Sequence, residues 1–270
     1  MKSMDTWLFS LRAEKNLMKD IRKMPASERL RNAQMIVEEL TKRVEFTLAL
    51  REQNTIILNS TRLSQQIPRS YAGNAFRVFQ ETVMRFEIIN ICGLWDKPEE
   101  GTISLPMAAV YLNSDEVLCD IRQSAFHRVR EVQTHWMSGN AELIEIFERT
   151  NKFKDMKCAV DAFNREGRKI SAILRRVDKC ERGETLRSLR DVRHHFAHNL
   201  KFTRESKRSE IQPITHAEVH GLLEESISLI ELLSLKINNV YFSIDNQLRE
   251  LLRDCAEDLW NNCTFSIKEL

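Results

Sequence analysis

The sequence predicts an all-α protein, a helical bundle built from long antiparallel helices. The 270 residues include only 7 Gly and 5 Pro, and 30% of them are charged. This balance favours long helices over turn-rich β structure. Apolar residues also recur at helical spacing through most of the chain. We expect an N-terminal extension (residues 1–24), one helical domain (residues 25–262) and a C-terminal tail (residues 263–270).

The first long helix is expected from Ser27, a possible N-cap behind Pro25, to about Gln53. A break at residues 60–68 should separate it from a second helix over residues 69–95. Apolar residues follow this second helix at helical spacing, and we expect them in the core. They are Ala72, Ala75, Phe76, Phe79, Val83, Phe86, Ile89 and Cys92.

The sequence DKPEEG at residues 96–101 is the clearest loop in the chain. A helix with acidic residues in its first turn should follow over residues 114–137. After a turn at residues 138–140, we expect a helix of about ten residues and then a long amphipathic helix over residues 152–180.

Gly183 should end this long helix as its C′ residue. Because another helix follows directly, we expect the two to pack antiparallel, so that basic residues from both surround one site. Residues 201–213 should form an exposed polar loop. Thr215 and Glu218 make a capping box for a helix running to about Phe242, and a last amphipathic helix is expected over residues 245–262.

Residues 187–200, RSLRDVRHHFAHNL, are the one stretch in which several residues able to handle phosphate and protons crowd together. Drawn as a helix starting near Thr185, this segment has an apolar stripe, and Arg193 projects into it. Such a break in pattern is expected where function outweighs packing. The stripe consists of Leu186, Leu189, Val192, Phe196 and Leu200.

Positive charge is concentrated around this segment. Residues 165–208 hold 14 Lys and Arg against 6 Asp and Glu, an excess of about eight positive charges, although the net charge of the whole chain is only +2. Such a field would steer an anionic substrate towards the segment. Basic helices are also common as plain solvated faces.

The spacing Arg193-His194-x-x-x-His198, with Ala197 before the last His and Asn199 after it, resembles the RxxxxH motif of the HEPN superfamily, and most closely its abortive-infection branch. The resemblance implies a HEPN-like helical bundle whose motif region covers residues 184–200. It also implies a homodimeric, metal-independent endoribonuclease that acts as a toxin or antiviral-defence effector. Its partners would be RNA and an antitoxin or regulator, with no cofactor.

Cleavage of RNA without a metal needs a base for the 2′-hydroxyl, an acid for the leaving 5′-oxygen and a cation for the phosphorane. His198 can act as acid or base near neutral pH, and Arg193 offers a planar fork to phosphate oxygens. The products would be a 2′,3′-cyclic phosphate and a 5′-hydroxyl. We assign substrate positioning to His194, Asn199 and Arg190, although Arg190 could equally be a solvated surface residue and Asn199 could cap the helix.

Residues five apart on a helix point about 140° away from each other. One Arg193 and one His198 are therefore poorly placed to act together unless the helix ends there. Two copies across a two-fold axis would solve this problem.

Three other interpretations stay open. Arg193 could pair with a buried carboxylate while the histidines face solvent, which would make the motif structural. A degenerate HEPN body could be a non-catalytic dimerisation or interaction protein. Finally, two histidine pairs at helical spacing could together bind zinc; these are His194, His198, His216 and His220.

The six cysteines are far apart and form no CxxC pair. Together with an N-terminus that does not resemble a signal peptide, this spacing predicts reduced thiols in a cytoplasmic protein. No apolar run approaches the roughly 18 residues that a membrane span needs, so we expect no membrane partner.

Overall fold

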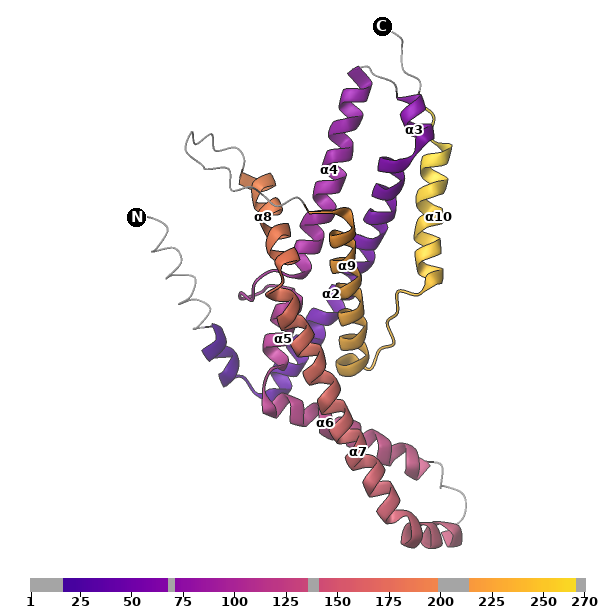
Figure 1. The fold of residues 1–270 in the computed structure, drawn as a ribbon. Helices are drawn as coiled ribbons and strands as arrows, with labels where there is room; N and C mark the ends of the chain where they lie inside the picture. Colours follow the sequence, from indigo (N-terminus) through magenta and orange to yellow (C-terminus); the bar gives the residue numbers. More distant parts are fainter. Residues whose placement is uncertain (1–16, 68–70, 136–140, 199–213, 266–270) are drawn as a thin grey trace, which may run out of the picture.

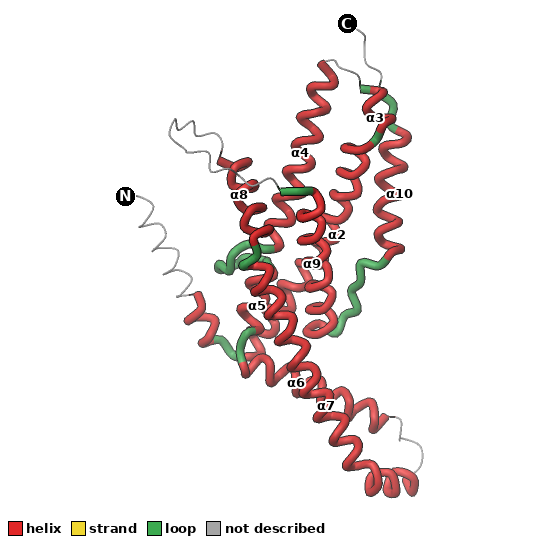
Figure 2. The backbone as a smooth tube through the Cα atoms, viewed as in Figure 1, coloured by secondary structure: helices red, strands yellow, loops and turns green. Residues whose placement is uncertain are grey.

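The computed structural model describes residues 17–67, 71–135, 141–198 and 214–265. Only the backbone is described for residues 71, 128–135, 141–156, 195, 197 and 198. Within these ranges all regular structure is helical and no strand occurs (Figure 2). The predicted all-α fold class is confirmed.

Helix α2 (Ala26–Asn59) is the central helix of the bundle. Its buried apolar residues recur every three to four positions, which gives one continuous face for α4, α5, α6, α9 and α10 to pack on. Its N-cap residue is Pro25 and no side chain caps the helix, so the predicted Ser27 cap is wrong. The helix also extends six residues beyond the predicted end at Gln53.

A short helix that the sequence analysis missed, α3 (Thr61–Gln66), follows after Ser60, whose hydroxyl accepts a hydrogen bond from the Leu63 N–H. It leads to α4 (Tyr71–Leu94), close to its predicted bounds. Part of the predicted core stripe on α4 is nevertheless exposed. Phe79, Phe86 and Ile89 keep 42%, 45% and 44% of their surface.

The exposure of this stripe follows from how α4 is covered. Helix α2 packs along α4, and α8 reaches only its second half (Figure 1). The buried side of α4 there includes Ile88, Ile91, Cys92 and Leu94, so the apolar face of α4 is wider than the surface that other helices cover.

Helices α5 (Leu105–Leu112) and α6 (Asp115–His135) follow the loop. Helix α5 was not predicted, although Ser104 caps it and Pro106 lies in its first turn. Helix α7 (Ala141–Glu181) is continuous over 41 residues, so the predicted division into two helices is wrong. At 1.5 Å per residue it is about 60 Å long, and its first part projects with α6 beyond the rest of the bundle (Figure 1).

Helix α8 (Glu184–His198) begins at the end of α7 and continues away from it, packing against α4 and α9 (Figure 1). The predicted antiparallel pairing with α7 is wrong. Only Arg182 and Gly183 separate the two helices, and the Gly183 N–H bonds back to the Cys180 carbonyl at 2.9 Å. A Cβ on Gly183 would lie 3.0 Å from that carbonyl oxygen, so this close turn, without a left-handed φ, accounts for the glycine.

The capping box of Thr215 and Glu218 is confirmed at the start of α9 (His216–Leu233). The helix does not continue to Phe242 as predicted. It passes into a π-helical turn, η1 (Ser234–Asn238), and ends at Asn239 with φ of 54°. Asn tolerates this left-handed conformation better than most residues. The predicted last helix is confirmed as α10 (Asn246–Asn262), and it packs on α2.

Candidate functional site

The apolar stripe of α8 fixes which side of this helix faces the bundle. Leu186 and Leu189 are fully buried, and Val192 and Phe196 pack partly buried against the core. Arg193, which we predicted to project into this stripe, is part-buried and faces the end of α4 and the loop that follows it.

Arg193 is held by a carboxylate of that loop. Its Nη1 donates to Oδ1 of Asp96 at 2.6 Å, and the two side chains keep 33% and 40% of their surface. Burial lowers the pKa of the guanidinium, but the hydrogen bond and charge of Asp96 more than offset this, so its pKa lies above the ordinary value. The bond takes one of the five N–H donors of the arginine.

Arg190 lies one turn earlier on α8 and donates to the carbonyl of Trp95. The indole of Trp95 is completely buried and donates from Nε1 to the hydroxyl of Ser226 on α9 at 2.8 Å. Trp95 and Asp96 therefore connect the end of α4 to both α8 and α9.

Cys92 lies one turn before this junction, inside the core. Burial raises the pKa of its thiol to about 11, although the positive charges of Arg193 and Arg190 oppose the shift. The thiol is neutral at physiological pH. Because the thiolate is the nucleophilic form of cysteine, this neutral thiol is unreactive. It packs as a small apolar group.

The remaining predicted site residues are placed as follows. His194 is exposed on α8. His198 is the last residue of α8, and its side chain lies outside the described residues. Asn199 lies entirely outside them. Phe196, between the two histidines, lies under the guanidinium of Arg85, with Cζ 4.8 Å from the ring centroid.

The interpretation of the motif as structural required Arg193 to pair with a buried carboxylate. Asp96 is a partner, but 40% of its surface is exposed, as is a third of that of Arg193. The guanidinium is thus both anchored and accessible to solvent. That combination suits a group that must bind phosphate in a fixed orientation.

The zinc interpretation finds no support among the side chains that the structure describes, where no group of three or more His, Cys, Asp or Glu could hold a metal ion. His220 lies on α9, with Nδ1 3.6 Å from Oε1 of Glu224. Burial and the charge of Arg51 lower the pKa of His220, while Glu224 opposes this.

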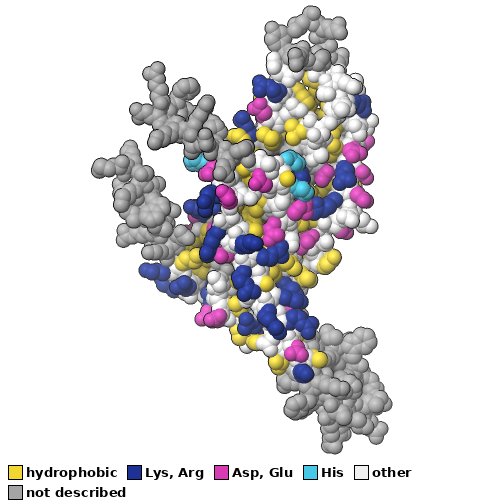
Figure 3. All heavy atoms as spheres, in the orientation of Figure 1, with side chains coloured by type: hydrophobic (Ala, Val, Ile, Leu, Met, Phe, Trp, Pro, Cys, Tyr) yellow, Lys and Arg dark blue, Asp and Glu magenta, His cyan; other side chains and the backbone are white. Residues whose placement is uncertain are grey.

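Basic side chains gather along α7 on one face of the molecule (Figure 3). Arg165, Arg168, Lys169, Arg175 and Lys179 are all exposed on this helix. The predicted concentration of positive charge therefore reaches solvent on the helix that leads directly into α8. No helix in the described ranges is long and apolar enough to cross a membrane.

Sequence reasoning missed Asp96. It identified residues 96–101 as a loop but gave none of them a role. Its place in the sequence could have pointed to it. Asp96 directly follows Trp95, the large apolar residue that ends the buried run of α4. A carboxylate at such a point lies at the edge of the core, where a half-buried arginine from another helix can reach it.

Comparison with known proteins gives a family for the chain. The AbiU2 family of HEPN proteins matches it over residues 32–258. No curated protein matches it, and no solved structure does. The match spans most of the chain and agrees with the helical fold, so the chain belongs to the HEPN AbiU2 family.

Proposed function

We propose that the protein is a metal-independent endoribonuclease that acts as a toxin or antiviral-defence effector, with its site at the end of α8. The observation that carries the proposal is the anchored but accessible guanidinium of Arg193 beside Asp96. It is supported by the exposed basic residues of α7 and by membership of a HEPN family.

Arg193 would bind phosphate oxygens and stabilise the charge of the phosphorane. Asp96 would act as a positioning residue, because its bond limits the orientations open to the guanidinium. His198 would transfer the proton to or from the reacting oxygens. His194, Arg190 and Asn199 would contact substrate, although the bond of Arg190 to the Trp95 carbonyl makes Arg190 partly structural.

We propose further that the enzyme is a homodimer. Arg193 and His198 point about 140° apart on a regular helix, and although α8 ends at His198, two copies across a two-fold axis would bring both groups to one phosphate. The exposed apolar residues of α4 support this proposal. Phe79, Phe86 and Ile89 form a face next to the region that α8 packs on. Phe46 of α2 is also half exposed and extends this face, with its ring centroid 6.1 Å from that of Phe86. Exposed apolar patches of this kind commonly mark protein interfaces.

The test is cleavage of total RNA and of single-stranded oligonucleotides by purified protein in EDTA. Wild type should cut and leave cyclic-phosphate ends, whereas Arg193→Ala and His198→Ala should cut far more slowly. Arg253→Gln removes an exposed charge from α10, away from the motif and from the basic residues of α7, and should cut like wild type. Equal cleavage by wild type and both motif variants would refute the assignment.

A non-catalytic interaction protein is the second candidate, and the exposed aromatic face of α4 favours it. Phe86→Glu separates the two candidates when oligomeric state and cleavage are measured together. An enzyme that needs two copies should lose its dimer and its cleavage in the same variant. If Phe86→Glu disrupts the dimer and the wild-type protein does not cut RNA, the result would support the interaction protein.

A further inference from the structure

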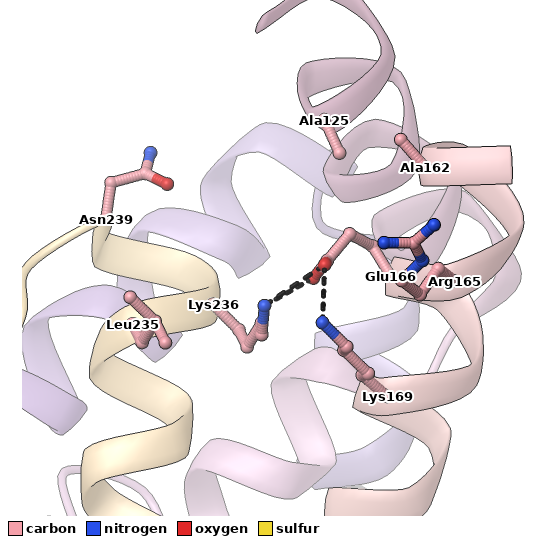
Figure 4. A pocket seen from close by; sticks show the side chains of 8 residues that line it. All are labelled: Ala125, Ala162, Arg165, Glu166, Lys169, Leu235, Lys236 and Asn239. Atoms are coloured by element: carbon pink, nitrogen blue, oxygen red, sulfur yellow. Dashed lines mark hydrogen bonds and ion pairs between the residues drawn. The ribbon is translucent and has the colours of Figure 1, made fainter. Parts of the chain in front are cut away.

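A cavity of about 360 Å³ lies between α6, α7 and the π-helical turn η1 (Figure 4). Its volume falls in the roughly 300–1,000 Å³ range of small-molecule sites. Its α7 residues lie about four to six helical turns before the start of α8, so it is separate from the proposed cleavage site. The residues that line it are Ala125, Ala162, Arg165, Glu166, Lys169, Leu235, Lys236 and Asn239.

The positive charges that line this cavity outnumber the negative ones. Three cations, Arg165, Lys169 and Lys236, surround the single carboxylate of Glu166. Lys236 Nζ lies 2.9 Å from one carboxylate oxygen and Lys169 Nζ lies 3.3 Å from the other. The cavity therefore holds an excess of two positive charges.

One cation of the cavity and its carboxylate partner are removed from water. The side chains of Lys236 and Glu166 keep only 14% and 16% of their surface. Burial raises the pKa of Glu166, but the hydrogen bond and charge of Lys236, helped by Lys169, lower it below the ordinary value. Glu166 is thus ionised at neutral pH and offsets one cation of the three. The two remaining cations, Arg165 and Lys169, reach solvent at the cavity, where they attract an anion.

A further cation lies nearby on α6. The guanidinium of Arg122 fits against Gly167, where it occupies the space that a Cβ would fill, and it lies over the ring of Phe163 at 5.7 Å. Its Nε is buried and has no hydrogen-bond partner among the described residues. It adds positive potential beside the cavity.

The wall opposite α7 has an irregular backbone that is hydrogen-bonded to α2. Leu235, Lys236 and Asn239 come from the π-helical turn and the left-handed residue that ends it. On its other side the turn is tied to α2, because Gln34 donates to the Ile237 carbonyl at 2.7 Å and Asn238 donates to the Gln34 carbonyl at 3.3 Å. A single π turn inside a helical protein frequently occurs at a functional site.

We propose that this cavity binds a small organic phosphate monoester. A monoester carries close to two negative charges at neutral pH, which matches the excess of the cavity. The side chains of Ala125, Ala162 and Leu235 form an apolar part of the lining, and they would contact the organic portion of the ligand. Asn239 offers an amide at the rim for a polar group of the ligand.

The test is isothermal titration of full-length protein in EDTA with four probes: AMP, cyclic AMP, inorganic phosphate and adenosine. AMP should bind saturably. Cyclic AMP, a diester with one charge, and inorganic phosphate, which lacks the organic part, should each bind about tenfold more weakly or worse. Adenosine should not bind. Equal binding of AMP and phosphate, or no binding of AMP, would overturn the proposal.

Four substitutions test the residues. Lys236→Gln and Arg165→Gln should each weaken AMP binding about tenfold, the usual loss for one charge-assisted contact. Arg165 is exposed, so its variant does not put folding at risk. Arg168→Gln removes the same charge three residues away, from a residue that does not line the cavity, and should bind AMP like wild type.

Glu166→Gln should change the affinity for AMP in the opposite direction. Because it removes the one carboxylate that competes for Lys169 and Lys236, it should tighten AMP binding. If the cations serve only to stabilise Glu166, the same variant loses thermal stability without gaining affinity for AMP, and the proposal fails. A short RNA that binds through Lys236 and Arg165 more tightly than AMP would also overturn the assignment to a small monoester.

Discussion

Replacing Asp96 with Asn should separate the stability of the protein from its proposed activity. The Arg193–Asp96 bond is 2.6 Å long, but both side chains are at least one-third exposed. Solvent screening therefore limits its contribution to the free energy of unfolding to about 0.5 kcal/mol, which corresponds to a change in Tm of about 1–2 °C for a chain of this size. The cleavage rate should depend on this bond far more than the stability does, because a group that binds phosphate must be held in a fixed orientation. We expect kcat/KM for RNA cleavage to fall about 10–100-fold.

The assay is a double-mutant cycle on kcat/KM with Asp96→Asn, Arg193→Ala and the combined variant. If Asp96 acts only by orienting Arg193, it should have no further effect once Arg193 is removed. Asp178→Asn is the matched control, since it breaks an ion pair of the same 2.6 Å length, between Asp178 and Arg182, away from the motif. A combined variant that cuts more slowly than Arg193→Ala alone would refute the positioning role, as would wild-type cleavage by Asp96→Asn.

Three other predictions concern the bundle around the site. Trp95→Ala should lower the free energy of unfolding by about 3–5 kcal/mol in urea titration, because it empties a fully buried position; a loss below 1 kcal/mol would contradict the packing described. Burial and the charge of Arg51 lower the pKa of His220, so the unfolded chain binds this proton more tightly than the native one. The Tm of wild type should therefore fall as the pH drops from 7.5 through 6.5 to 5.5, and this part of the fall should be absent from His220→Gln; identical pH profiles would count against the assignment. Cys92 should resist alkylation by iodoacetamide in the native protein while exposed Cys158 reacts, and mass spectrometry that finds both modified equally would show that the core opens.

The sequence predicted those helices whose signals are local. The α9 start follows from a capping box, and α8 follows from the apolar spacing and from Gly183 before it. Helix ends that depend on tertiary contacts were harder to predict from the sequence. Periodicity alone could not indicate that α7 continues through residues 141–151, or that the π turn after Leu233 would end the regular helix early.

Apolar patterning also could not distinguish a core face from an exposed one on α4. Phe79 and Phe86 have the spacing of core residues, yet the helix that would cover them is absent from the described part of the chain. Arg193 was recognised because a charge interrupts an apolar stripe. Its partner Asp96 is 97 residues earlier in the chain, and no local pattern links two positions that meet only when α4 and α8 pack.

Two adjacent residues at the end of α4 bind two other helices, and this limits how the motif helix could be transplanted. The Trp95 carbonyl and the Asp96 carboxylate hold α8 through Arg190 and Arg193, while the Trp95 indole holds Ser226 of α9. A graft of α8 alone into another bundle would carry the arginines without the groups that align them. The smallest exchangeable unit is α8 together with residues 95–96 and the α9 serine, three segments that are distant in sequence and would have to move as one.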